Sequence, residues 1–230
     1  MFLGGEMKKY QLNDLNGLKT TKAIDFRAYF SEELLAKAEL FVYEKNDYIV
    51  RLDQKVEHLF FLLEGRAKIY KIHENGKRSL LQFLVTGDFI GELTLLDVEE
   101  QVKDVQAIDR CLCLAFPYTT AQTELLNDNH FLRMISKYLG RKVLLRVEHF
   151  SNNQNYELKY RLAAYMLQTE VDGIYHEKQT ETAEFLGVSY RHLMYTLNEF
   201  VENELVEKQG KTYILNLTEL SKLSKDLMNY

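Results

Sequence analysis

Residues 179–197 read QTETAEFLGVSYRHLMYTL and predict two short helices joined by a tight turn. Ala183 is small where two helices would cross closely, and Gly187 stands where the turn needs a positive φ. Ser189 is a favourable N-cap for the second helix. The positions expected to face the space between the helices are apolar: Leu186, Val188 and Leu193. The pattern predicts a helix-turn-helix, although an ordinary helical hairpin can carry the same small residue and glycine.

The start of the second helix supplies the residues that would read DNA. In a helix-turn-helix the second helix enters the major groove, and the residues near its N-terminus meet the base edges. Downstream, residues 205–215 predict a hairpin that turns at Gln209-Gly210, with two lysines placed to touch phosphate as in the wing of a winged helix. The expected DNA-binding residues are therefore Ser189, Tyr190, Arg191, His192, Tyr195, Lys208 and Lys211.

Upstream, from about residue 41, short β-rich runs alternate with turn signals. The runs are Phe60–Leu63, Ala67–Ile72, Leu80–Val85, Val102–Ile108 and Cys111–Phe116. The turn signals include Asn75-Gly76, and Pro117, the only proline, ends the last run. This pattern is typical of a small antiparallel barrel or sandwich. Residues 1–40 are expected to be a helical segment before the barrel, because the stretch from Ala28 to Phe41 has roughly helical apolar spacing.

Residues 128–150 predict one long helix, because they contain no proline and carry a continuous apolar stripe. The stripe consists of Phe131, Ile135, Leu139, Val143, Val147 and Phe150. Such a helix can lie on the barrel, pair with a second copy of itself, or do both. The polar residues 151–155 predict a linker. The expected α+β chain has a β-barrel domain with a helical N-terminal segment (1–127), the long helix (128–152) and a winged helix-turn-helix domain (153–230).

Two blocks of sequence, in this order, point to a known family. The first is FFLLEGRAKIY at 60–70, followed by NGK at 75–77 and GDFIGEL at 87–93, and the second is the helix-turn-helix with its wing. Together they resemble, from about Val42 to Asn216, the cyclic-AMP receptor / fumarate-nitrate regulator (CRP/FNR) family of bacterial transcription regulators. The Tyr190-Arg191-His192 start is similar to a less-studied branch of that family.

The resemblance implies a fold, partners and a mechanism. The fold is a jelly-roll β-barrel like a cyclic-nucleotide-binding domain, then a dimerisation helix and a winged helix-turn-helix. The partners are double-stranded DNA, a second copy of the chain through the striped helix, and RNA polymerase if the protein is an activator. The implied mechanism is that the ligand state of the barrel repositions the DNA-binding domains.

The base-reading positions depart from the best-known members. Those members carry a glutamate and, four residues later, an arginine, where this sequence has Arg191 and Tyr195. Arginine pairs bidentately with guanine, whereas glutamate accepts a hydrogen bond from cytosine. We therefore expect a different operator.

The effector loop also departs from the cyclic-nucleotide binders that it resembles. Gly91, Glu92 and Leu93 match the loop that offers amides to the phosphate and a glutamate to the ribose. The arginine that neutralises the phosphate falls on Gln101, and the neighbours of the nearby Lys103 do not match. Enclosing a phosphodiester without a fixed cation is costly. Cyclic AMP is therefore not expected as a ligand, no cofactor is expected, and Glu92 can equally be a carboxylate that stabilises a helix N-terminus.

Charge and targeting signals add two expectations. The net charge of the chain is −5, and residues 151–230 carry eight Lys and Arg against twelve Asp and Glu, a difference of −4. Because DNA affinity depends on the phosphates neutralised locally, specific binding should be possible but unusually salt-sensitive. No apolar run approaches the roughly 20 residues that span a bilayer, and residues 1–6 lack a signal pattern, so a cytoplasmic protein without a membrane partner is expected.

Other classes of function remain as alternatives. A metal-dependent cupin enzyme needs clustered ligands, but the six histidines show no His-x-His or His-x-x-His spacing, so neither a metal nor catalytic residues are expected. Cys111 and Cys113 should lie on one face of a strand, as buried small residues or as a redox switch. The chain could also be an effector-independent regulator whose barrel only scaffolds the dimer, or a protein-interaction module that no longer binds DNA.

Overall fold

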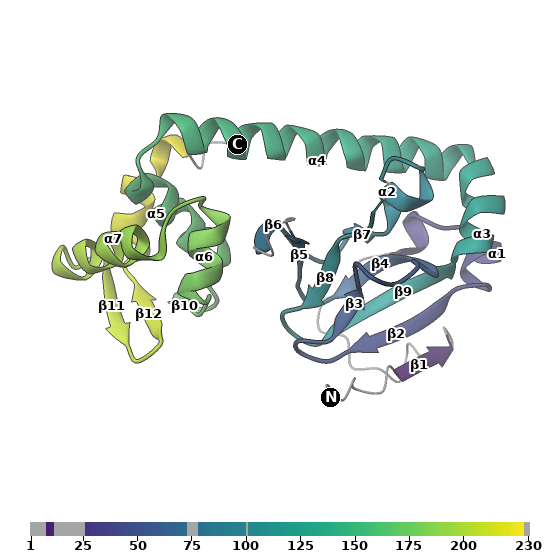
Figure 1. Ribbon diagram of the computed structural model, residues 1–230, viewed down its shortest axis with the longest axis horizontal. Helices are drawn as coiled ribbons and strands as arrows, with labels where there is room; N and C mark the ends of the chain where they lie inside the picture. The colour runs from purple at the N-terminus through teal and green to yellow at the C-terminus, as the bar shows by residue number, and fades with distance from the viewer. Residues whose placement is uncertain (1–7, 12–25, 73–77, 100, 228–230) are drawn as a thin grey trace. The chain divides into compact units, whose positions relative to one another are not determined.

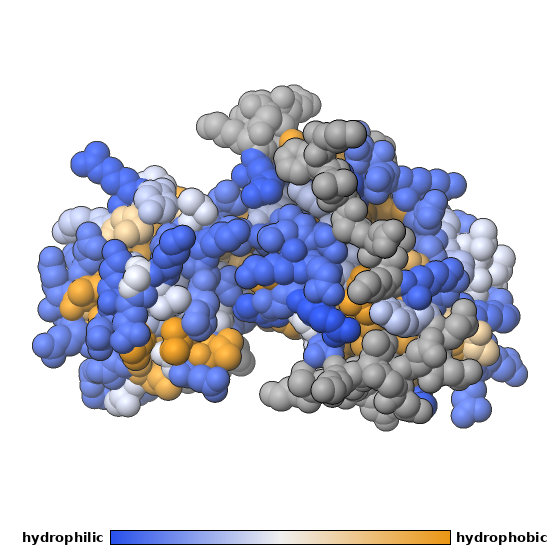
Figure 2. All heavy atoms as spheres, turned by 90° about the horizontal axis from the view of Figure 1, so that it is seen from below, coloured by the Kyte–Doolittle hydropathy of each residue, from blue (hydrophilic) through white to orange (hydrophobic). Residues whose placement is uncertain are grey.

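The computed structural model describes residues 8–11, 26–72, 78–99 and 101–227, so the expected turn at Asn75-Gly76 lies outside the described residues. The chain divides into two compact units, residues 1–139 and 140–230, which share the long helix α4 (Asn129–Asn155; Figure 1). The surface seen in Figure 2 is mainly hydrophilic, with apolar residues in small separate patches. In the part of the chain described, no helix is long and apolar enough to cross a membrane.

The first unit contains two antiparallel sheets, as the sequence predicts. One sheet has five strands in the order β1 (Lys8–Gln11), β2 (Glu39–Tyr43), β9 (Cys111–Pro117), β4 (His58–Glu64) and β7 (Phe89–Ile90). The other has four strands in the order β3 (Tyr48–Val50), β8 (Asp104–Ala107), β5 (Ala67–Ile72) and β6 (Arg78–Leu84).

Strand β9 shows why the five-stranded sheet is buried on both faces. Its large residues, Leu112, Leu114 and Phe116, alternate with its small residues, Cys111, Cys113 and Ala115. The large set belongs to a core formed with helices, and the small set belongs to a second core shared with the four-stranded sheet. Both thiols are buried, and burial raises the pKa of Cys111 to about 12 and that of Cys113 well above its usual range. The cysteines are therefore small core residues that resist forming thiolates.

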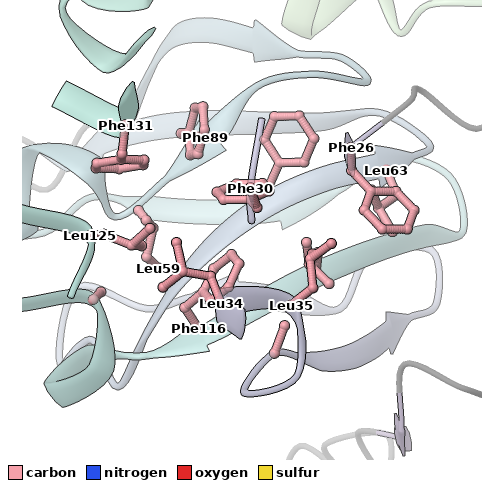
Figure 3. Packing of buried hydrophobic residues seen from close by; sticks show 14 of the residues in the cluster. Phe26, Phe30, Leu34, Leu35, Leu59, Leu63, Phe89, Phe116, Leu125 and Phe131 are labelled. Atoms are coloured by element: carbon pink, nitrogen blue, oxygen red, sulfur yellow. The ribbon is translucent and has the colours of Figure 1, made fainter. Parts of the chain in front are cut away.

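Short helices cover the outer face of the five-stranded sheet. They are η2 (Phe26–Ala28), α1 (Glu32–Leu35), α3 (Tyr118–Thr123) and η3 (Leu125–Asn127), followed by the start of α4. Figure 3 shows Phe30, Phe89 and Phe131 together in this core, and the rings of Phe30 and Phe116 lie 4.7 Å apart. The first turns of α4 are thus part of the first unit.

The second unit is built from helices and a small sheet. After α4 come α5 (Leu158–Thr169), α6 (Gln179–Phe185), α7 (Tyr190–Glu202), α8 (Leu217–Leu223) and η4 (Lys225–Leu227). The strands β10 (Ile174–Tyr175), β12 (Thr212–Leu215) and β11 (Val206–Gln209) form a sheet in that order. The expected hairpin is present, and its turn lies at Gly210-Lys211, one residue beyond the predicted turn.

The expectation of a helical N-terminal segment is wrong for residues 8–11. These residues form strand β1, which pairs antiparallel with β2, and Lys9 makes a 2.7 Å ion pair with Glu39. Without β1, strand β2 would lie at the edge of the sheet with unpaired backbone groups. The backbone hydrogen bonds that residues 8–11 make with β2 therefore decide their conformation, and the apolar spacing of the segment does not. Helical turns occur only later, at 26–28 and 32–35 among the described residues of this segment.

The expectation of a linker at 151–155 is also wrong, because these residues are the last turns of α4. Their side chains bond within the helix: Asn155 Nδ2 donates to the carbonyl of Ser151 at 2.8 Å. The polar composition reflects exposure to water, and the segment contains neither glycine nor proline to break the helix. The first connection after α4 comes at Tyr156-Glu157.

Candidate nucleic-acid interface and effector loop

Helices α6 and α7 are joined by the tight turn that the sequence predicts. Gly187 has φ +66°, and no atom of the described residues lies within 4 Å of the place where its Cβ would stand, so the backbone conformation, and not a lack of space, favours glycine. Ser189 Oγ accepts a hydrogen bond from the His192 N–H at 3.2 Å, which caps α7. Ala183, Leu186 and Leu193 are buried between the helices, and Val188 is half-buried.

The outer face of α7 carries the expected base-reading residues. Tyr190, Arg191, His192 and Tyr195 are all exposed, while the inner face is fixed by Leu193, Leu197 and Phe200. No carboxylate in the described part of the chain pairs with Arg191. Its guanidinium is therefore available, in the first turn of a helix that a buried face holds in place.

The β11–β12 hairpin presents the two expected lysines. Lys208 and Lys211 are both exposed, and Gly210 has φ +61° in the turn between them. The Gln179 side chain donates a hydrogen bond to the Lys211 carbonyl at 3.4 Å, which ties this turn to the first residue of α6. Sequence reasoning missed Gln179, because its partner lies 32 residues away.

Part of the acidic charge of this unit is withdrawn from its surface. Glu177 and Glu181 are buried, and Glu181 also lies 3.6 Å from Lys178. The surface of this unit therefore carries fewer carboxylates than the sequence count implies, although Glu207 is exposed on the hairpin beside Lys208.

The expected effector loop follows strand β7. Gly91 has φ +89° and a Cβ there would come within 3.2 Å of the His58 carbonyl, so no other residue fits without strain. It precedes the single turn of α2 (Glu92–Leu95). Glu92 is buried in the first turn of that helix, and Leu93 is half-buried.

The two candidate phosphate-binding residues do not complete a cationic site. Gln101 is exposed, and the half-buried Lys103 forms a close ion pair with Glu99. Glu99 also accepts a 3.0 Å hydrogen bond from Thr94 Oγ1 and so belongs to the loop. An anion at this loop would have to compete with the Glu99 carboxylate for Lys103. Sequence reasoning missed Glu99, because only the folded loop brings it to Lys103 and Thr94 together.

The apolar stripe of α4 lies in two environments. Phe131 and Ile135 are 0% and 2% exposed in the core of the first unit, and Leu139 packs at its margin. Val143, Val147 and Phe150 are 58%, 60% and 64% exposed, and they lie beside the exposed Leu144 and Leu145. Phe131 and Ile135, expected as dimer-helix residues, are therefore core residues of the first unit.

Tyr138 links α4 to the strand that precedes the effector loop. Its hydroxyl donates to Asp88 Oδ1 at 3.1 Å and accepts from the Phe89 N–H at 3.2 Å. Burial, followed by the nearby Asp88 and Glu92 carboxylates, raises the pKa of Tyr138 well above its usual range. The phenol thus stays protonated and keeps its donor.

Comparisons with known proteins show which family the chain resembles. The model of the cyclic nucleotide-binding domain matches residues 40–128. The regulatory protein YeiL of Escherichia coli O157:H7 is 39% identical over 203 residues, which are 88% of this chain and 93% of that protein. The cAMP-activated global transcriptional regulator CRP of Salmonella typhimurium is 23% identical over 194 residues, with 80% of this chain and 92% of that protein covered.

A solved structure shows the same fold. A CRP/FNR-family transcriptional regulator from Thermus thermophilus, TTHA1359, superposes with a TM-score of 0.69 at 18% identity, and the match covers 81% of this chain and 98% of that chain. At this identity the likeness concerns the fold alone.

Proposed function

Since the chain belongs to the CRP/FNR family of transcription regulators, we propose that it binds double-stranded DNA as a homodimer. In this proposal the barrel domain at 1–127 senses a small molecule, the long helix at 128–152 joins two copies, and the domain at 153–230 reads DNA. RNA polymerase is a further partner if the protein is an activator.

One observation carries the DNA-reading role. Arg191 is exposed and unpaired by carboxylates in the described chain, and it lies in the first turn of a helix that Ser189 caps and a buried face holds. A helix N-terminus placed in this way can enter the major groove, where the guanidinium fits the O6 and N7 acceptors of guanine. The nearby Lys208 and Lys211 supply charge for the phosphates.

The exposed half of the α4 stripe supports the dimer. Five large apolar side chains are exposed between residues 143 and 150, and a lone helix gains nothing from presenting them to water. A second copy of the same segment would cover them. The two copies of α7 in such a dimer, related by a two-fold axis, would then select an inverted repeat in the DNA.

The effector loop favours a ligand other than a cyclic nucleotide. Gln101 cannot neutralise a phosphate, and Lys103 is already paired with Glu99. A second candidate function follows from the same pair: an effector-independent regulator in which the barrel only supports the dimer.

Selection of bound sequences from random DNA by the purified protein tests the DNA-reading role. The wild type should enrich an inverted repeat with a guanine in each half-site. Arg191→Ala should lose roughly 1–3 kcal/mol of discrimination at one base pair, whereas Lys211→Ala should weaken binding evenly across sequences. Lys222→Ala is the matched control, because Lys222 lies on α8 and pairs with Glu219. If Arg191→Ala leaves both affinity and base preference unchanged, α7 does not read the bases as proposed.

A further inference from the structure

Arg161, on α5, is a partly buried cation whose partners are all uncharged. Its Nε donates to the Tyr156 carbonyl at 3.0 Å, and its Nη1 donates to Asn153 Oδ1 at 2.6 Å and to the Leu186 carbonyl at 2.7 Å. No carboxylate of the described residues is among its partners. Burial lowers the pKa of the guanidinium, which nonetheless stays charged because an arginine pKa begins so high.

The three acceptors lie at the C-terminal ends of two helices. Asn153 is in the last turn of α4 and Tyr156 follows its last residue, while Leu186 closes α6. The last carbonyls of a helix lack partners within the helix and carry the negative end of its dipole, so a cation is stabilised there. One side chain therefore joins the end of α4 to the turn between α6 and α7.

A second contact lies one helical turn earlier on the same face of α4. The His149 ring packs at a tilt against Phe185 with centroids 4.6 Å apart, and Phe185 packs on Tyr165 of α5 at 5.0 Å. Burial, and then Arg161, lower the pKa of His149, which favours the neutral imidazole and so a contact without a buried charge. The last turns of α4 are thus fastened to α6 at two levels.

The start of α4 is fastened instead to the first unit, through Phe131, Ile135 and Tyr138. Between the two sets of contacts stands Gly140, the only glycine of α4, at the boundary of the compact units. Gly140 is exposed, and none of the described residues has an atom within 4 Å of the place where its Cβ would stand. Packing against the described part of the chain therefore does not explain this glycine, which weakens the interior of the helix.

We propose that Arg161 is a positioning residue that fixes α6 and α7, the two helices proposed to read DNA (the reader), to residues 141–155 of α4. These parts then move as one body, and the chain bends at Gly140. The inference rests on the proposed DNA-binding function. It assigns the bend to the middle of α4 and not to the polar residues that end it. In a dimer, the fixed link would set the distance between the two readers and so the spacing of the half-sites.

The test measures how strictly the full-length protein requires that spacing. Affinities are compared for the selected operator, for a single half-site, and for the operator with two base pairs inserted between half-sites. The insertion turns one half-site by roughly a fifth of a helical turn and should cost the wild type about thirtyfold or more, because one reader loses its contacts.

The variants are Arg161→Gln, which removes the guanidinium that makes all three bonds, and Asn153→Ala, which removes only the bond to the last turn of α4 and leaves those to the Tyr156 and Leu186 carbonyls. Asn153→Ala keeps the test decisive if Arg161→Gln does not fold. In both, the cost of the insertion should fall below about fivefold, with half-site affinity within about twofold of wild type. The control, Lys159→Gln, makes the same charge change on the same helix at a surface residue paired with Glu157, and should keep the wild-type pattern.

Two results would overturn the inference. Either both variants keep the full cost of the insertion, or they lose half-site and operator affinity equally, as a purely structural role would require. If the wild type binds no DNA, the proposed function fails, and hydrogen exchange decides the inference separately. Asn153→Ala should then speed exchange in residues 147–155 about tenfold or more relative to α7, and unchanged exchange would contradict the rigid link.

Discussion

The two halves of α4 share one apolar stripe but have opposite surroundings. Phe131 and Ile135 are buried in the first unit, whereas Val147 and Phe150 belong to the second unit and are exposed. The periodicity identifies the apolar face of the helix, but not what covers it. One half is explained by packing within the chain, and the other is exposed among the described residues and is the part that we propose a second copy covers.

The largest expected effect comes from truncating one phenylalanine in each half. Phe131→Ala should lower the free energy of unfolding of the first unit by about 3–5 kcal/mol, because it leaves a cavity in a packed core. Phe150→Ala, the matched change, should act only through the dimer. Denaturant titrations at several protein concentrations measure both. If Phe150→Ala costs as much as Phe131→Ala and the cost does not depend on concentration, the contrast between the halves is wrong.

The half of α4 that packs on the first unit can be probed at the candidate effector loop, because Tyr138 of this half bonds to Asp88, which lies just before the loop. We expect cyclic AMP to bind weakly, because the loop lacks the bidentate arginine and Lys103 is paired with Glu99. The missing contact is worth roughly 3 kcal/mol, which moves a micromolar dissociation constant towards millimolar. Calorimetric titration with cyclic AMP and cyclic GMP checks this. A dissociation constant of micromolar order would mean that another cation replaces the arginine.

The smallest expected effect on stability comes from Gly140, which lies between the two halves of α4. Gly140→Ala should raise the free energy of unfolding by about 0.5–1 kcal/mol, because alanine favours the helix and the site has room for its methyl group. Thermal and denaturant unfolding measure the change. A loss of stability would show that Gly140 has a close neighbour in the assembled protein, and the two halves would then meet at a packed joint.

The parts of the molecule that sequence reasoning anticipates are those with local causes. The positive φ of Gly187, the cap by Ser189 and the alternation along β9 each depend on a few neighbouring residues, and the structure confirms them. One part that it misses depends on a distant partner, because strand β1 forms at the open edge of β2. The other has a local cause that the polar composition hides: residues 151–155 contain no glycine or proline and bond within the last turns of α4.

The candidate sites divide in the same way. The exposure of Arg191 follows from the position of its neighbours in the helix, whereas the pairing of Lys103 with Glu99 and the links of Arg161 depend on the folded loop and on helix ends far apart in sequence. The roles of these residues in DNA and effector binding stay predictions.

The mass of the protein in solution tests most directly the claim that the second half of α4 joins two copies. Sedimentation equilibrium at micromolar concentration should give a dimer for the wild type and a monomer for Val147→Glu, because the substitution places a charge in the apolar seam. Ser136→Glu, which adds the same charge at an exposed residue of the first half, should remain a dimer. A Val147→Glu variant that stays dimeric at micromolar concentration would contradict this account of α4.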